Sequence, residues 1–250
     1  MKKLYLLLFM AISLISCGFL ANKPKGDLTY CSYCCAGAAG LGTDYCELIA
    51  EPDSVPKVVV VLDEDNRFDN PVIRQSYPVD KSVVDSLQQL LKAEKVYKLN
   101  GYHVDEAICG GRAYSFSVRY SSGDRISVDW YGHNIKEKAW DAYHMIEHFF
   151  RPWRERAQRD GLIQQRTERI VAMGELFDHV SEAVRTQTAY PDLDKDVNTL
   201  RRYIMNKEWQ EDFDACEKGV IPKETQNGVL SKDAIYMLLG DSDLRKLMRK

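Results

Sequence analysis

The pattern of apolar and polar residues predicts a small β-sheet in the first half of the chain. The run Lys57–Leu62 is almost entirely β-branched, which is typical of a buried strand. A second strand is expected over residues 73–79. Residues 114–120 and 126–130 alternate between apolar and polar side chains, and the Ser-Ser-Gly-Asp of residues 121–124 predicts a turn between them. One apolar and one polar face indicate an antiparallel sheet covered on one side.

Two amphipathic helices are expected to cover this sheet. The first begins after Asp80, a plausible N-cap, and its apolar face is formed by Val83, Val84, Leu87, Leu90 and Leu91. The second is capped by Asn134 with Glu137 as its capping-box partner. Its apolar face is formed by Ile135, Ala139, Tyr143, Ile146, Phe150 and Trp153. The sequence therefore predicts an α+β domain over residues 57–153, with an antiparallel-rich sheet and covering helices.

The rest of the chain predicts an all-α domain over residues 154–250. One apolar seam steps by three and four residues through Ile170, Met173, Phe177, Val180 and Val184. A turn at residues 190–192 precedes a returning seam of Leu193, Val197, Leu200 and Ile204. The two seams indicate an antiparallel helical hairpin. Further on, Ser231 is expected to cap another helix, with Leu230 and Ile235 as a hydrophobic staple.

The last third of the chain resembles a known bacterial family. The residues that carry the resemblance are the Trp-x-x-Asp segment and the acidic stretch of 209–219, Ile221-Pro222, and the Gly-Val-Leu-Ser helix start of 228–239. They resemble the domain of unknown function 4298 family over about residues 163–249. Lys232 replaces an expected acidic residue, which does not undermine the match. The resemblance implies a compact helical domain and supplies no activity or catalytic residue.

Three acidic residues within the resemblance have two interpretations. Asp212, Asp214 and Glu217 could form a cation-binding cluster, or they could lie on a solvated helix face. We favour the solvated face.

The N-terminus predicts export and lipid anchoring. Lys2 and Lys3 precede an apolar run that is too short to span a bilayer, so residues 1–16 are expected to be a signal peptide. Leu14-Ile15-Ser16-Cys17 resembles the lipobox of bacterial lipoproteins. The resemblance implies that the signal is removed and that the Cys17 thiol carries the lipid. The alternative is an ordinary secretory signal with a chance cysteine.

Residues 17–30 are expected to be a lipidated tether, because they have no apolar periodicity. Gly18 follows the lipobox in place of an aspartate, and no acidic run follows Cys17. By resemblance to known lipoprotein sorting, we expect a lipid-anchored protein of the outer membrane that faces the periplasm. The membrane is one expected partner, through the lipid, and an envelope protein or a small molecule is another.

Residues 31–56 form a Cys/Gly-rich segment. Six cysteines remain after Cys17, and export would allow all six to form disulfide bonds: Cys31, Cys34, Cys35, Cys46, Cys109 and Cys216. Free, half-buried thiols and a metal site are the alternatives, although a second C-x-x-C pair is missing. A thiol-redox function through Cys31, Cys34 and Cys35 is an alternative to binding.

The helix that follows Gly132 contains the zinc-peptidase pattern H-x-x-E-H, with His144 and His148 as metal ligands and Glu147 as base. Glu224 lies where a third ligand is often found. We nevertheless expect no metal, because both histidines fall opposite the apolar face centred near Ile146. A zinc hydrolase is therefore kept only as an alternative function.

Composition narrows the remaining functions. The formal net charge is −3 with no basic stripe, so nucleic acid is not expected as a partner. The sequence shows no phosphate loop and no nucleophile–base pair, and we expect no cofactor. A group of aromatic residues could line a ligand groove or belong to the hairpin core: Tyr102, Tyr114, Tyr120, Trp130 and Tyr131. The leading interpretation is a non-catalytic binding or scaffolding module.

Overall fold

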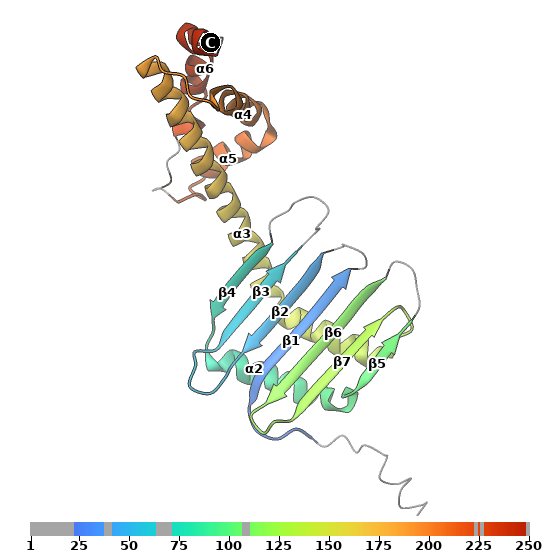
Figure 1. Cartoon of the computed structure of the whole chain (residues 1–250). Coiled ribbons are helices and arrows are strands. Elements are labelled where there is room, and N and C mark those ends of the chain that lie inside the picture. Colours follow the sequence, from blue (N-terminus) through green and yellow to red (C-terminus); the bar gives the residue numbers. More distant parts are fainter. Residues whose placement is uncertain are drawn as a thin grey trace, which may run out of the picture. The chain divides into compact units, whose positions relative to one another are not determined.

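The computed structural model describes residues 23–37, 42–63, 72–106, 111–222, 225 and 228–248 (Figure 1). The predicted signal, Cys17, Cys109 and Glu224 lie outside the described residues. The chain divides into two compact units, Met1–Gln158 and Arg159–Lys250. Each unit is considered by itself.

The first unit is built on a seven-stranded sheet. Its strands are β1 (Leu28–Gly37), β2 (Thr43–Ile49), β3 (Lys57–Leu62), β4 (Ile73–Pro78), β5 (Tyr102–Asp105), β6 (Arg112–Tyr120) and β7 (Arg125–Tyr131). They lie in the order β4-β3-β2-β1-β6-β7-β5. Neighbouring strands are antiparallel except for β5, which runs parallel to β7. The predicted α+β fold with an antiparallel-rich sheet is confirmed.

The Cys/Gly-rich segment is not separate from this sheet, which corrects the expectation for residues 31–56. These residues form most of β1 and all of β2, and β1 is the central strand. Cys31 and Tyr33 of β1 point into the core together with Cys46 of β2. A buried thiol behaves as a small apolar side chain, so this segment packs as a strand without needing disulfide bonds.

Two helices cover one face of the sheet. These are α2 (Lys81–Ala93) and the first part of α3 (Glu137–Thr186), and both lie behind the sheet in Figure 1. A short 3₁₀ helix, η2 (Val96–Leu99), follows α2. One row of the covered face crosses five strands through Val128, Phe116, Tyr33, Cys46 and Val60. All five side chains are buried beneath the helices, as the apolar alternation requires.

Helix α3 differs from the sequence prediction in where it begins and in how far it continues. It begins at Glu137, so Asn134 is not its cap, and it continues through Pro152 in one 50-residue helix. A proline inside a helix lacks one N–H donor, but Phe150 and Ala157 on either side of Pro152 remain buried in the core of the first unit. The boundary between the two units falls within α3, at residues 158 and 159, rather than before residue 154.

The second unit is helical, as predicted. The last part of α3 is followed by α4 (Leu193–Met205), α5 (Lys207–Glu217), η3 (Gly228–Leu230), α6 (Lys232–Gly240) and α7 (Ser242–Leu247). The buried residues of both predicted seams share one core, including Ile170 and Val180 from α3 and Val197 and Leu200 from α4. The predicted cap is confirmed, because Ser231 Oγ accepts from the Ala234 N–H at 3.3 Å.

The preferred interpretation of the acidic residues is wrong for Asp212. Its side chain is fully buried and accepts hydrogen bonds from Arg169 Nε at 2.8 Å, Arg169 Nη2 at 2.6 Å and the Tyr203 hydroxyl at 2.8 Å. Burial and the bond to Asp212 raise the pKa of Tyr203, which keeps this hydroxyl a donor. Asp212 therefore joins α3, α4 and α5 inside the helical unit.

Removal of the Asp212 carboxylate is expected to destabilise the helical unit strongly. Asp212→Ala leaves Arg169 and Tyr203 without their acceptor, and breaking such a pair costs about 3 kcal/mol of unfolding free energy. Asp214→Ala is the matched control, because the Asp214 carboxylate accepts from Gln210 Nε2 at 2.8 Å in an exposed pair, and it should cost about 0.5 kcal/mol or less. Urea unfolding followed by circular dichroism measures both. Equal losses would contradict the assignment.

Candidate ligand-binding site

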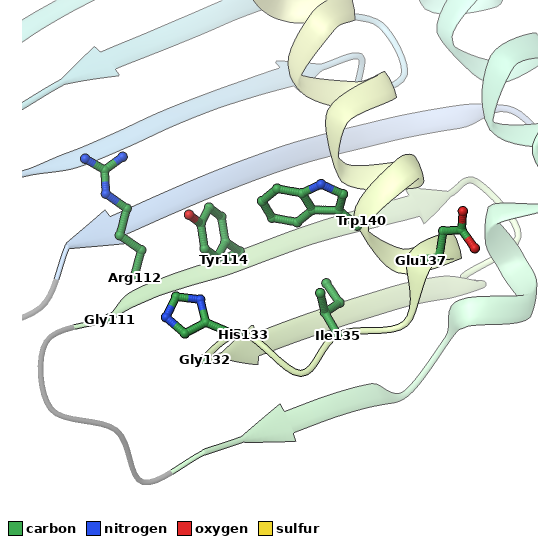
Figure 2. A pocket seen from close by; sticks show the side chains of 8 residues that line it. All are labelled: Gly111, Arg112, Tyr114, Gly132, His133, Ile135, Glu137 and Trp140. Atoms are coloured by element: carbon green, nitrogen blue, oxygen red, sulfur yellow. The ribbon is translucent and has the colours of Figure 1, made fainter.

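A pocket of about 590 Å³ opens where β6 begins, β7 ends and α3 begins. Eight residues line it: Gly111, Arg112, Tyr114, Gly132, His133, Ile135, Glu137 and Trp140 (Figure 2). Its volume lies within the range that is usual for small-molecule sites.

One wall of the pocket is aromatic and preorganised. The Trp140 side chain is 37 % exposed, and its ring meets Tyr114 edge to face at a centroid distance of 5.5 Å. Behind them, Trp130 stacks on Tyr114 at 5.3 Å and Tyr143 stacks on Trp140 at 6.2 Å. Because Trp130 and Tyr143 are buried in the core, they hold the exposed Trp140 ring and the half-buried Tyr114 ring in place before any ligand arrives.

Charged side chains stand at opposite ends of this aromatic wall. Arg112 and His133 lie at one end of the pocket in Figure 2, while Glu137 lies beyond Trp140 at the other. All three side chains are exposed. The Arg112 guanidinium donates to the Cys35 sulfur at 3.8 Å. The pocket thus offers a cation, an aromatic surface and a carboxylate in sequence.

The loop after β7 is fixed by one carboxylate. The backbone N–H groups of His133 and Asn134 both donate to Glu106 Oε2, at 2.9 and 3.3 Å. Gly132 has φ +109°, and a Cβ atom there would lie 2.3 Å from the same Glu106 oxygen. Only glycine fits this position, both because of the left-handed backbone and because the carboxylate occupies the space.

A cluster of polar side chains outside the pocket lies between α3 and the sheet, and its role is structural. The Arg154 guanidinium bonds the Asp44 carboxylate and lies 3.8 Å from Glu147 Oε1. Beside it, the Cys46 thiol donates to the Tyr33 hydroxyl at 3.5 Å. Burial raises the pKa of Tyr33 and raises that of Cys46 to about 11, so both stay protonated at neutral pH. These groups tie α3 to the sheet and offer no thiolate or general base.

The zinc pattern on α3 does not assemble into a site within the described residues. His144 and His148 are exposed, as predicted, and His144 Nδ1 lies 2.7 Å from Glu147 Oε2. No group of three metal-ligating side chains occurs in the described part of the chain. Glu224 lies outside it.

Cys31 and Cys34 of β1 do not face each other. Cys31 faces the core and Cys34 faces the uncovered side, because strand residues alternate. Burial raises the pKa of both thiols, which is opposite to what a reactive cysteine needs. Cys31, Cys34, Cys35 and Cys46 are free thiols in this structure. Disulfide bonds that involve Cys109, or Cys216 of the helical unit, stay predictions.

The five aromatic residues that the sequence analysis considered together lie in different places in the structure. Tyr120 and Trp130 are core residues, whereas Tyr114 lines the pocket. Tyr102 lines a neighbouring cavity, and its hydroxyl accepts from the Lys136 N–H at 2.9 Å. The Tyr131 hydroxyl accepts from the Gly111 N–H at 3.2 Å.

Sequence reasoning missed four pocket residues, namely Arg112, His133, Glu137 and Trp140. One signal was available for Trp140. A tryptophan that lies off the apolar stripe of an amphipathic helix is exposed, and an exposed tryptophan often marks a contact surface. No comparable signal marks Arg112, because an exposed arginine at a strand start is common.

Comparison with known proteins identifies the C-terminal part of the chain. Residues 165–249 match the family described as a domain of unknown function (DUF4298). The resemblance predicted from the sequence is confirmed, and the chain carries a C-terminal DUF4298 domain. No curated protein matches the chain. The family description assigns no role to any residue of this domain.

Thiol reactivity should follow burial. In the folded protein at pH 8, we expect iodoacetamide to modify Cys34 and Cys35 before Cys31 and Cys46, whose burial raises their pKa values. Cys31 and Cys46 should react only after unfolding in urea. They should then react without any added reductant, because they are free thiols. Peptide mass mapping with and without reductant measures both points. A requirement for reductant would instead show a disulfide bond, and rapid native modification of Cys31 would contradict its burial.

Proposed function

We propose that this protein is a lipid-anchored binding module of the cell envelope, and that its first unit binds a small ligand in the pocket beside Trp140. The exposed Trp140 ring carries the proposal. It stands on a wall of buried aromatic residues, with Arg112 and Glu137 on opposite sides of it. An exposed tryptophan held in this way offers a rigid surface for a ring at little entropic cost.

The arrangement favours binding over catalysis. The eight described lining residues include no serine, threonine or cysteine that could act as a nucleophile. Arg112 and Glu137 are separated by the aromatic wall, so they suit recognition of two ends of one molecule rather than proton transfer at one atom.

The ligand chemistry follows from the same three groups. A ring with an apolar face would stack on Trp140, a carboxylate would pair with Arg112, and hydroxyl groups would donate to Glu137. An acidic sugar combines these features, and acidic sugars are available in the bacterial envelope. The volume of about 590 Å³ is sufficient for one or two such rings.

Anchoring through Cys17 supports the same interpretation. The lipobox-like Leu14-Ile15-Ser16-Cys17 follows a short apolar run with a basic start. Across the part of the chain that the structure describes, no helix has the length and apolarity to cross a bilayer. A lipid on Cys17 would hold the module at the membrane.

Ligand binding can be tested with two sugars that differ in one group. N-acetylmuramic acid carries a carboxylate that N-acetylglucosamine lacks, and saturation-transfer NMR should show tighter binding of the acid. Trp140→Ala should weaken binding of both at least about tenfold. Arg112→Gln should abolish only the preference for the acid. Tyr236→Ala is the control, because Tyr236 is an exposed aromatic residue of the helical unit. Equal binding to wild type and Trp140→Ala would refute the pocket.

Anchoring can be tested separately in a bacterial host. The mature protein should begin at Cys17, carry acyl chains there and need detergent for extraction from membranes. Cys17→Ser should lack the acyl mass, while Cys34→Ser, the control, should keep it. Mass spectrometry of the N-terminal peptide decides, and a mature N-terminus elsewhere would contradict the anchor.

A further inference from the structure

The start of the folded chain is bound to the sheet, although residues 17–30 were expected to be a free tether. The Lys25 N–H donates to Asp124 Oδ2 at 2.8 Å, and the Asp27 N–H donates to Ser121 Oγ at 3.0 Å. In return, the Ser122 hydroxyl donates to the Lys25 carbonyl at 2.6 Å. The bond from Lys25 lowers the pKa of Asp124, so this latch (residues 25–28 on the β6–β7 turn) is complete at neutral pH.

A buried glutamine completes the latch from the side of α2. Gln88 Oε1 accepts from the Leu28 N–H at 2.9 Å, and Gln88 Nε2 donates to the Gly26 carbonyl at 3.2 Å. Gly26 has φ +79°, and a Cβ atom there would lie 2.4 Å from Ser121 Oγ. The latch therefore depends on a glycine and fixes where the N-terminal segment leaves the sheet.

This exit point limits how far the first unit can stand from a lipid on Cys17. Lys25 lies eight positions after Cys17 in the sequence. A fully extended chain gains at most about 3.6 Å per residue, so the span is at most about 29 Å. The end of the sheet that carries the β6–β7 turn can then lie no farther than about 29 Å from Cys17.

The same end of the sheet carries a row of cationic and apolar side chains on its uncovered face. Register places Arg125, Arg119, Tyr30, Ile49 and Lys57 side by side across five strands. The Arg119 guanidinium lies 4.6 Å from the centre of the Tyr30 ring.

Two features of this end call for an anionic, partly apolar partner. Arg119 and Arg125 are directly opposite each other, and like charges in that position repel unless an anion lies between them. No ion pair of either arginine occurs among the described residues. Beside the row, Val55 of the β2–β3 loop is 71 % exposed. The same loop carries exposed Glu51 and Asp53, and the β6–β7 turn carries exposed Asp124, so the excess of positive charge is confined to the row itself.

We propose that this row and Val55 rest on the anionic phospholipid surface of the membrane that holds Cys17. Arginine and lysine pair with phosphate groups, while Tyr30 and Val55 suit the boundary between head groups and acyl chains. The inference rests on the proposed anchoring. The Trp140 pocket begins at Arg112, at the opposite end of β6, so it would open away from the bilayer.

Vesicle binding by unlipidated protein tests the surface without the anchor. Residues 18–250 should sediment with vesicles of phosphatidylcholine and 30 % phosphatidylglycerol, and not with phosphatidylcholine alone. Raised salt should weaken the binding. Arg119→Gln with Arg125→Gln should reduce it at least about tenfold, since each cation near such a surface contributes substantially. Arg151→Gln with Arg159→Gln changes the charge equally on the exposed side of α3 and should leave it unchanged.

Each outcome separates the surface from the anchor. Equal sedimentation with both vesicle types, or an unchanged Arg119/Arg125 variant, would overturn the proposed surface whether or not Cys17 is acylated. An equal loss in both double variants would mean that net charge alone drives binding, which would also overturn it. An N-terminal peptide without acyl mass would refute the proposed lipid anchor. The result of the vesicle experiment would still be interpretable, because it uses unlipidated protein.

Discussion

The packing of β1 against α3 is the constraint on which the first unit depends. Tyr33, from the centre of the sheet, meets Tyr143 edge to face at 5.8 Å and Phe150 at 5.6 Å. All three side chains are buried, so they fix both the position of the helix over the sheet and its rotation about its own axis. A helix with this rotation buries one stripe and must leave the residues beside that stripe exposed. Trp140 is one of them, and the pocket exists because the buried rings hold Trp140 there.

The same packing gives the two faces of the sheet different chemistry. The covered face is filled by apolar rows and ends at the aromatic wall of the pocket. The uncovered face keeps polar and charged side chains, among them Arg119 and Arg125 next to the β6–β7 turn. Because β6 runs from Arg112 to Tyr120, the pocket and the latch occupy its opposite ends. If the proposed anchor at Cys17 holds the latch near a membrane, the pocket lies at the other end of β6.

The DUF4298 domain is organised by a different interaction. Asp212 is surrounded by Arg169 and Tyr203, and the three bring α3, α4 and α5 together. A buried carboxylate is stable only when its hydrogen bonds are satisfied, and Arg169 of α3 and Tyr203 of α4 satisfy those of Asp212. The aspartate of the Trp-x-x-Asp segment, Asp212, thus supports the fold. The binding proposal rests on the first unit, and the helical domain contributes no residue to it.

The sequence by itself determined the local elements. Alternation predicted the β6–β7 hairpin, the β-branched run predicted β3 to the residue, and Ser231 was recognised as a helix cap, because each signal depends on neighbours within one turn or one strand. Only the tertiary structure decided that β1 and β2 form the centre of the sheet, that Asp212 is buried and that residues 25–28 are latched to a distant turn. These features depend on partners tens of residues away. A short polar or glycine-rich segment carries no mark of the strand, carboxylate or turn that it will meet in the fold.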